Sequence, residues 1–259
     1  MTAPRNTGQR PLRPLGNLIE PEVMDAVTNS FRGKQWKPTV ILVSSTVLML
    51  AWWEFGSPDF YRRHLASLWT LWGNEGVTAA VYSFAACFLL LGVLPAGIVK
   101  LVFRERLVDY GVSLGLRKQT TLALLMLVPL FVLVAYIGSM IPAIREYYPI
   151  NRQDMSTRLF AFHACTYVLF YLGWEFHFRG FLQFGLRDSV GPVNAVLIQV
   201  LASSLLHAGR PSLELFLSVI AAVLWGMLAF YCRSILAGLA QHTALGIALD
   251  WFICMRNGA

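Results

Sequence analysis

The chain has 259 residues, of which 56% are hydrophobic and 14% are charged, and its formal net charge is +7. Soluble domains typically contain about 45–50% apolar and about 25% charged residues. This composition disfavours a soluble cytosolic enzyme, a disordered chain and a nucleic-acid-binding protein. The basic residues lie between apolar runs, as they do in polytopic membrane proteins. We therefore expect the lipid bilayer as the environment and no nucleic acid as a partner.

Residues 1–37 are polar and rich in Pro and Gly, and they lack the apolar core of a cleaved signal peptide. The first apolar stretch is therefore expected to direct the chain to the membrane. We interpret residues 1–37 as a cytoplasmic polar leader, with a short surface helix near Glu20–Ser30.

Seven stretches approach the roughly 20 apolar residues that a membrane-spanning helix requires. They lie at about 38–55, 77–99, 120–142, 158–186, 192–208, 213–231 and 234–255. Because the fifth and sixth are short, we predict an all-α polytopic transmembrane bundle of about seven spanning helices, within a range of six to eight. Charged and apolar residues interleave over 104–118, which predicts an amphipathic segment at the lipid interface.

The distribution of Lys and Arg predicts the orientation, because cytoplasmic loops carry the excess of basic residues. The leader and the second connection are rich in them, whereas the first and third connections have few. The basic residues of the leader and the second connection are Arg5, Arg10, Arg13, Arg32, Lys34, Lys37, Lys100, Arg104, Arg106, Arg117 and Lys118. Those of the first and third connections are Arg62, Arg63, Arg145, Arg152 and Arg158. The leader is therefore expected in the cytoplasm, and seven spans would place the C-terminus outside.

Ionisable groups inside a bilayer cost about 2.5–3.5 kcal/mol each on insertion scales, so each one is a candidate for function. The candidates are His163, Glu175, His177, Arg179, His207, His242 and Asp250, with Arg210 and Glu214 near a helix boundary. Glu175 and Arg179 are four residues apart, so they can pair on one helical face. A structural ion pair explains this spacing equally well. His177 projects elsewhere and is not expected to join them.

Three of these groups are expected at similar depth in the membrane. At 1.5 Å per residue, Glu175, His207 and His242 lie about 16, 22 and 12 Å from the cytoplasmic ends of their helices. His207 precedes a Gly-Arg-Pro break, where a lone histidine is more often a capping residue. His242 shares a helical face with Gly246 and Asp250. A carboxylate and two imidazoles that meet inside a membrane indicate a general acid–base site.

These residues resemble the motifs of the CPBP family of intramembrane glutamic endopeptidases, which includes CAAX prenyl endopeptidases and bacteriocin-processing or immunity proteins. The family's first motif, Glu-Glu-x-x-x-Arg followed by Gly, is matched by Trp174-Glu175-Phe-His-Phe-Arg179-Gly180. Its second, an aromatic residue four positions before His, is matched by Ser203-Ser-Leu-Leu-His207. Its third, His-x-x-x-Asn, is matched by His242-Thr-Ala-Leu-Gly246, and the resemblance covers about residues 104–255.

The sequence departs from this pattern at three positions, where Trp174 replaces the first Glu, Ser203 the aromatic residue and Gly246 the Asn. It is similar to a bacterial branch with Trp-Glu-x-x-x-Arg-Gly and a His-x-Gly-Lys/Arg-Pro-x-x-Glu extension. The residues that match this extension are His207, Gly209, Arg210, Pro211 and Glu214. The resemblance implies a protease core at 104–259 and accessory transmembrane helices at 38–103, in a bacterial inner membrane.

The activity that the resemblance implies is hydrolysis of a peptide bond in a membrane-associated protein or peptide. No covalent intermediate, metal or cofactor is expected. Glu175, working with His207, would activate the attacking water. His242 would donate to the developing oxyanion, because a preorganised donor in a dry site stabilises this charge. Arg179 would hold Glu175 in position.

Three further residues are expected to support this site. Asp250 would orient His242 from the same helical face. Glu214 is the reserve candidate for the role of the missing first Glu, and Arg210 lies beside it in the sequence.

Other functions stay open. Glu175, His207 and His242 could bind zinc with one open position, as in a zinc-dependent membrane protease. A catalytically silent CPBP-like membrane scaffold or immunity protein is favoured by Trp174 and Gly246. Buried Glu, His and Arg also form relays in proton-coupled transporters, although the sequence lacks the matching Gly/Pro-broken helices of the two halves.

Overall fold

The computed structural model describes residues 21–30, 33–149 and 157–256, and within these ranges every regular element is helical. Six helical segments are long and apolar enough to cross a membrane. They are Trp36–Phe55, Glu75–Phe103, Arg117–Gly138, Arg158–Val190, Ser212–Cys232 and Leu236–Arg256. The structure therefore confirms the prediction of an all-α polytopic bundle.

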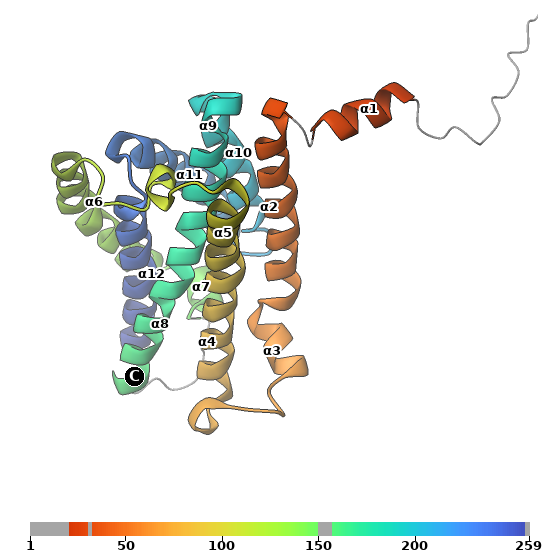
Figure 1. The fold of residues 1–259 in the computed structure, drawn as a ribbon. Helices are drawn as coiled ribbons and strands as arrows, with labels where there is room; N and C mark the ends of the chain where they lie inside the picture. Colours follow the sequence, from red (N-terminus) through yellow and green to blue (C-terminus); the bar gives the residue numbers. More distant parts are fainter. Residues whose placement is uncertain (1–20, 31–32, 150–156, 257–259) are drawn as a thin grey trace, which may run out of the picture.

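The first half of the chain forms the accessory helices. They are α1 (Pro21–Ser30), α2 (Trp36–Phe55), α3 (Pro58–His64), α4 (Glu75–Cys87) and α5 (Leu94–Gly97). The last two join through π-helical turns into one long span. Helix α1 matches the expected surface helix and points away from the bundle (Figure 1). The basic leader residues Arg5, Arg10, Arg13 and Arg32, together with Arg152, lie outside the described ranges.

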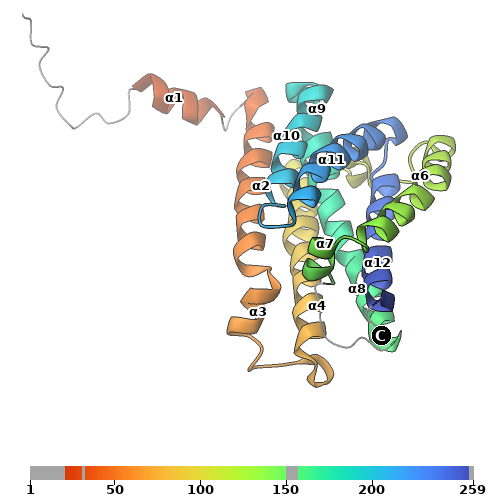
Figure 2. The ribbon, with the colours of Figure 1, turned by 180° about the vertical axis from the view of Figure 1, so that it is seen from behind.

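The second half forms the helices that carry the motifs. They are α6 (Arg117–Gly138), α7 (Pro142–Tyr147), α8 (Thr157–Glu175), α9 (Gly185–Val190), α10 (Pro192–Leu205), α11 (Ser212–Cys232) and α12 (Leu236–Arg256). A π-helix, Phe176–Phe184, joins α8 to α9. The end of α12 lies at the opposite end of the bundle from the start of α2 (Figure 1). Seen from behind, α10, α11 and α6 form the near side of the bundle (Figure 2).

Helix α10 is too short to cross a bilayer. Its 14 residues extend about 21 Å at 1.5 Å per residue, whereas the hydrocarbon core is about 30 Å thick. The chain therefore leaves helical structure at 206–211, inside the depth of the bundle, before α11 begins. Irregular backbone at this depth is tolerated only where protein buries it or where it lines a water-filled cavity.

The predicted amphipathic segment at 104–118 is mostly irregular, with one 3-10 turn at Leu107–Tyr110. Tyr110 is buried, while Val108, Val112 and Leu114 expose apolar side chains, as expected at a lipid interface. Two backbone hydrogen bonds join the segment to the connection between α11 and α12, from Leu116 N to Cys232 O and from Ile235 N to Gly111 O.

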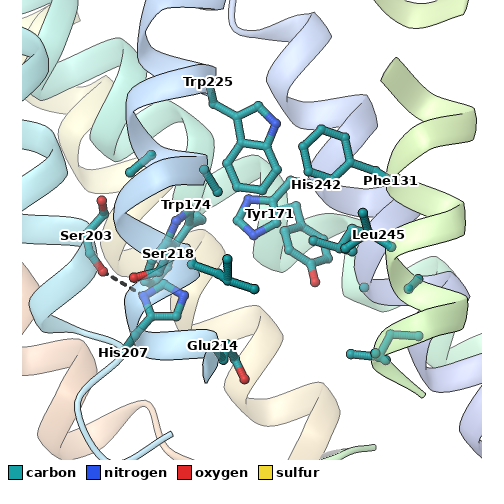
Figure 3. Close-up of a pocket in the computed structure, with 18 of the residues that line it drawn as sticks. Phe131, Tyr171, Trp174, Ser203, His207, Glu214, Ser218, Trp225, His242 and Leu245 are labelled. Atoms are coloured by element: carbon teal, nitrogen blue, oxygen red, sulfur yellow. Dashed lines mark hydrogen bonds between the residues drawn. The ribbon is translucent and has the colours of Figure 1, made fainter. Parts of the chain in front are cut away.

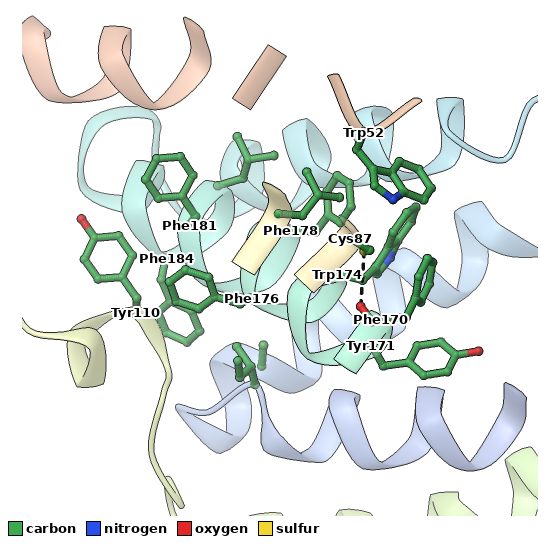
Figure 4. Packing of buried hydrophobic residues seen from close by; sticks show 14 of the residues in the cluster. Trp52, Cys87, Tyr110, Phe170, Tyr171, Trp174, Phe176, Phe178, Phe181 and Phe184 are labelled. Atoms are coloured by element: carbon green, nitrogen blue, oxygen red, sulfur yellow. Dashed lines mark hydrogen bonds between the residues drawn. The ribbon is translucent and has the colours of Figure 1, made fainter. Parts of the chain in front are cut away.

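An aromatic core attaches the accessory helices to α8 (Figure 4). Trp52 of α2 packs edge-on against Trp174 of α8, with ring centroids 5.6 Å apart. Phe84 of α4 stacks on Tyr167 of α8 at 4.3 Å. The accessory helices therefore support the segment that carries the first motif.

Gly173 allows α8 to approach the backbone of the neighbouring span closely, because a Cβ there would lie 2.6 Å from the carbonyl oxygen of Cys87. Overpacking of this kind costs about 1–3 kcal/mol. We expect Gly173→Ala to lower the free energy of unfolding in detergent by that amount. Gly97→Ala is the control, since a Cβ at Gly97 has nothing within 4 Å. Equal stability of the two variants would contradict this account of the packing.

Candidate active site

A carboxylate, a guanidinium and an imidazole meet at the junction of α8 and the π-helix. Glu175 Oε1 accepts a hydrogen bond from His242 Nδ1 at 2.9 Å and lies 3.2 Å from Arg179 Nη1. The Glu175 side chain is fully buried, and that of Arg179 is 1% exposed. The structure therefore brings together three of the residues predicted from sequence.

Local backbone structure permits this meeting. Glu175 is the last residue of α8, and the wider π-helical turn begins at Phe176; π-helical turns occur often at functional sites. On the neighbouring helix α12, Gly238 faces the carboxylate, and a Cβ there would lie 2.9 Å from Glu175 Oε2. A glycine at this position lets α12 approach α8 closely enough for the hydrogen bond from His242.

Two aromatic side chains pack against the His242 ring. It stacks on Trp225 of α11 with centroids 4.1 Å apart and contacts Tyr171 of α8 at 4.5 Å. Since Nδ1 donates to Glu175, the neutral ring has Nε2 as its free acceptor. The His242 side chain is 13% exposed, so this imidazole connects the buried carboxylate to the space beyond it.

His207 lies in the irregular segment after α10. Its Nδ1 donates to the carbonyl oxygen of Ser203 at 2.8 Å, so its Nε2 is likewise a free acceptor. Its ring meets Trp174 edge-on at 5.6 Å. Among the contacts of the described residues, His207 makes no hydrogen bond to Glu175 or to His242.

A cavity of about 380 Å³ connects the two histidines (Figure 3). Its walls come from α6, α8, α11, α12 and the segments around Tyr148 and His207. Aromatic and aliphatic side chains line most of it, and its charged or titratable lining residues are Tyr148, Tyr167, Tyr171, Arg179, His207, Arg210, Glu214 and His242. Glu175 does not line the cavity and therefore reaches it through His242.

Arg210 and Glu214 form a second polar group in this cavity. Glu214 Oε1 accepts hydrogen bonds from Tyr148 Oη at 2.7 Å and from Arg210 Nη1 at 2.9 Å. The other oxygen, Oε2, is buried and has no hydrogen-bond partner among the described residues. The side chains of Arg210 and Glu214 are only 15% and 22% exposed, so this pair is held within protein next to the irregular segment.

The structure gives Asp250 a different partner from the one expected. Its Oδ2 lies 2.9 Å from His163 Nε2 of α8, and no hydrogen bond to His242 is found within the described chain. Eight residues of helix separate His242 from Asp250, about 12 Å along the axis, which is too far for direct contact. Asp250 therefore does not contact His242 directly, and its supporting role stays a prediction. His177, as expected, stays outside the site, packed against Phe178 and Phe181.

The packing explains two of the departures from the family pattern. Trp174 fills the aromatic core between Trp52 and Phe178 and also meets His207 at the wall of the cavity, so a Glu here would give up these ring contacts. A Cβ at Gly246 would overlap the Tyr171 hydroxyl. The third position, Ser203, is buried, and its backbone carbonyl holds His207. Tyr171 and Trp225 are not predicted as site residues from the sequence, because aromatic residues inside apolar helices carry no signal that separates a site from a core.

Gly246→Asn, which restores the family's residue, is expected to displace Tyr171 and to destabilise the protein by about 1–3 kcal/mol. Tyr171 packs against Tyr167 and His242, so moving it would break these ring contacts. Thermal unfolding in detergent measures the effect. Gly138→Ala is the control, because a Cβ there makes only an ordinary contact, 3.5 Å from Leu249 Cδ1. Unchanged stability of Gly246→Asn would show that the site accommodates the Asn.

The described residues contain no group of three or more His, Cys, Asp or Glu side chains arranged to hold a metal ion. The metal content of the purified protein, with its sensitivity to chelators, is the measurement that bears on the zinc alternative.

The fold and the site define a polytopic membrane protein with a mostly apolar cavity between its helices, lined by two imidazoles. Residues 156–248 match the family described as "Type II CAAX prenyl endopeptidase Rce1-like". The match covers about a third of the chain and contains all three motifs. It confirms the predicted relation of this segment to the CPBP and CAAX protease family, while the bacterial branch stays a prediction. No curated protein and no solved structure matches the chain significantly.

Proposed function

We propose that this protein is an intramembrane endopeptidase that cleaves a membrane-associated protein or peptide by water activated at His242 and His207. The observation that carries the proposal is the 2.9 Å hydrogen bond between Glu175 and His242, placed behind a cavity that both histidines line. The match of residues 156–248 to a family of CAAX-type endopeptidases supports the same reaction class.

The proposed reaction divides the roles differently from the sequence-based expectation. A water in the cavity would donate its hydrogens to Nε2 of His242 and Nε2 of His207. As its oxygen attacks the peptide carbonyl, His242 takes a proton, and Glu175 stabilises the resulting imidazolium at Nδ1. When the carbon–nitrogen bond breaks, His242 returns this proton to the leaving amine. General acid–base catalysis of this kind contributes about 10²–10⁴-fold.

The neighbouring charges have supporting roles in this proposal. Arg179 neutralises the buried Glu175 and keeps its Oε1 at His242. Arg210 lines the cavity and supplies a cationic donor for the developing oxyanion. Glu214 is the carboxylate that lines the cavity; its Oε2 has no hydrogen-bond partner among the described residues, and it is our candidate to assist His207 in holding the water.

Comparison of new protein termini in membranes tests the proposal even while the substrate is unidentified. Cells that produce the wild-type protein should contain cleaved termini that are missing with Glu175→Gln and with His207→Ala at equal expression. His64→Ala, a change of a histidine outside the cavity, should leave the termini unchanged. Identical termini in all four samples would contradict the proposal.

A catalytically silent scaffold is the second candidate, because Trp174 and Gly246 stand where the family carries polar residues. Both substitutions are accommodated by close packing. If the protein is a scaffold, we expect the wild-type protein and Glu175→Gln to bind a partner equally well, and we expect neither of them to cleave it.

We also propose that the start of α2 faces the cytoplasm of a bacterial inner membrane. More basic residues lie at this end of the bundle than at the other, as the positive-inside rule requires (Figure 1). Those at the cytoplasmic end are Lys37, Lys100, Arg104, Arg106, Arg117, Lys118, Arg187 and Arg233. Single cysteines introduced in the connection at 65–70 should be labelled in intact cells, whereas single cysteines introduced at 104–116 should stay unlabelled. The reverse pattern would contradict this orientation.

A further inference from the structure

A second carboxylate–imidazole pair joins the same two helices as the proposed active site. His163 Nε2 of α8 and Asp250 Oδ2 of α12 lie 2.9 Å apart, and both side chains are 1% exposed. Neither residue lines the cavity, and the proposed reaction does not use them.

The two pairs are reciprocal. In the site, α8 supplies the carboxylate Glu175 and α12 supplies the imidazole His242. In the second pair, α8 supplies the imidazole and α12 the carboxylate. The pairs lie about three helical turns apart on α8 and about two on α12. They are therefore two polar links along one helix–helix interface.

The second pair makes no other side-chain hydrogen bond within the part of the chain that the structure describes. The remaining polar atoms, Asp250 Oδ1 and His163 Nδ1, are buried without a hydrogen bond. A slide or rotation of α12 against α8 would separate the pair and leave both groups buried and unsatisfied, which is strongly unfavourable in a low-dielectric interior. The pair therefore fixes how α8 and α12 sit relative to each other.

Packed rings connect the second pair to the site. The His163 ring lies 5.4 Å from Tyr167, Tyr167 lies 4.7 Å from Tyr171, and Tyr171 lies 4.5 Å from His242. These contacts form a continuous row of rings from His163 to the imidazole that meets Glu175.

We propose that His163 and Asp250 are positioning residues that hold His242 at hydrogen-bond distance from Glu175. Their effect on catalysis depends on the function proposed above, whereas their effect on the geometry of His242 does not. The test therefore begins with a measurement that requires no substrate.

Proton NMR of the purified protein in detergent can detect imidazole N–H groups bonded to carboxylates. We expect two low-field resonances, one removed by His242→Gln and the other by His163→Gln. Asp250→Asn should also shift or broaden the resonance of the Glu175–His242 bond. Gln199→Leu is the control, because it breaks a buried bond between α10 and α11, from Gln199 Nε2 to Ala222 O, and it should leave the Glu175–His242 resonance in place. An unchanged Glu175–His242 resonance in Asp250→Asn would overturn the proposal.

Kinetics provide the second measurement once a substrate is known. A small displacement of a catalytic group can cost about 10²-fold, so Asp250→Asn should lower kcat by up to this factor and change KM little. The exchanged variant, His163→Asp with Asp250→His, should recover most of kcat and restore the resonance. A loss of kcat that the exchange does not recover would count against a positioning role. If no cleavage is found while the resonance still responds to Asp250→Asn, the proposed function fails and the positioning role stands.

Discussion

His242→Ala is expected to lower kcat by about 10²–10⁴-fold, the usual contribution of a general acid–base residue. The change removes the group that links the buried Glu175 to the cavity, and no other imidazole hydrogen-bonds to this carboxylate among the described residues. KM should change little, because the apolar walls of the cavity remain. Initial rates on a membrane-embedded substrate, measured with purified protein, give both constants.

His177→Leu is the matched control for this loss. His177 is also a fully buried histidine near the first motif, but it packs against Phe178 and Phe181 and does not line the cavity. The control should retain kcat within a small factor. A kcat that falls equally in both variants would mean that the loss comes from disturbed packing and would remove the support for His242 as the base.

Trp174→Glu, which restores the family's first motif, is expected to destabilise the protein rather than to activate it. Trp174 is 2% exposed and packs against Trp52, Phe170 and Phe178, with ring centroids 4.7–5.6 Å away. A Glu here would lose these ring contacts and would place a carboxylate at the wall of the cavity beside His207, and the lost packing alone costs about 3–5 kcal/mol. The free energy of unfolding in mixed detergent micelles is the measurement.

Trp174→Phe separates the loss of volume from the introduced charge. It keeps an aromatic ring against Trp52 and should cost much less than the Glu variant. If Trp174→Glu folds with wild-type stability and cleaves faster, the packing around this position must differ from the packing described. The position would then accept the first Glu of the family's motif.

The spans can be predicted from the sequence because a long apolar run has only one stable conformation in a bilayer. The expected stretch at 213–231 corresponds to α11 at Ser212–Cys232, and that at 120–142 to α6 at Arg117–Gly138. The shortness of α10 can also be anticipated, since the run at 192–208 is the shortest of the seven. The irregular backbone after it can be recognised from the Gly-Arg-Pro break that follows His207.

The partners of the polar residues are harder to predict. Depth along the helices places Glu175 and His242 at one level, and the structure pairs them. The rotation of each helix about its axis decides which side chain faces which neighbour, and hydropathy does not contain this information. The sequence pattern therefore favours His242, on the same helix, as the partner of Asp250, whereas Asp250 meets His163 of α8. For the same reason, the contacts of Tyr171 and Trp225 with the His242 ring cannot be predicted from hydropathy.

Hydrolysis by purified protein in lipid vesicles tests most directly whether His242, hydrogen-bonded to Glu175, acts on water in a cavity within the membrane. The measurement is the rate at which wild-type protein, Glu175→Gln and His207→Ala release a mass-identified fragment from a substrate found by comparison of termini. We expect cleavage by the wild-type protein and a loss of at least about 10²-fold in each variant. Cleavage at an unchanged rate by folded Glu175→Gln would contradict this expectation.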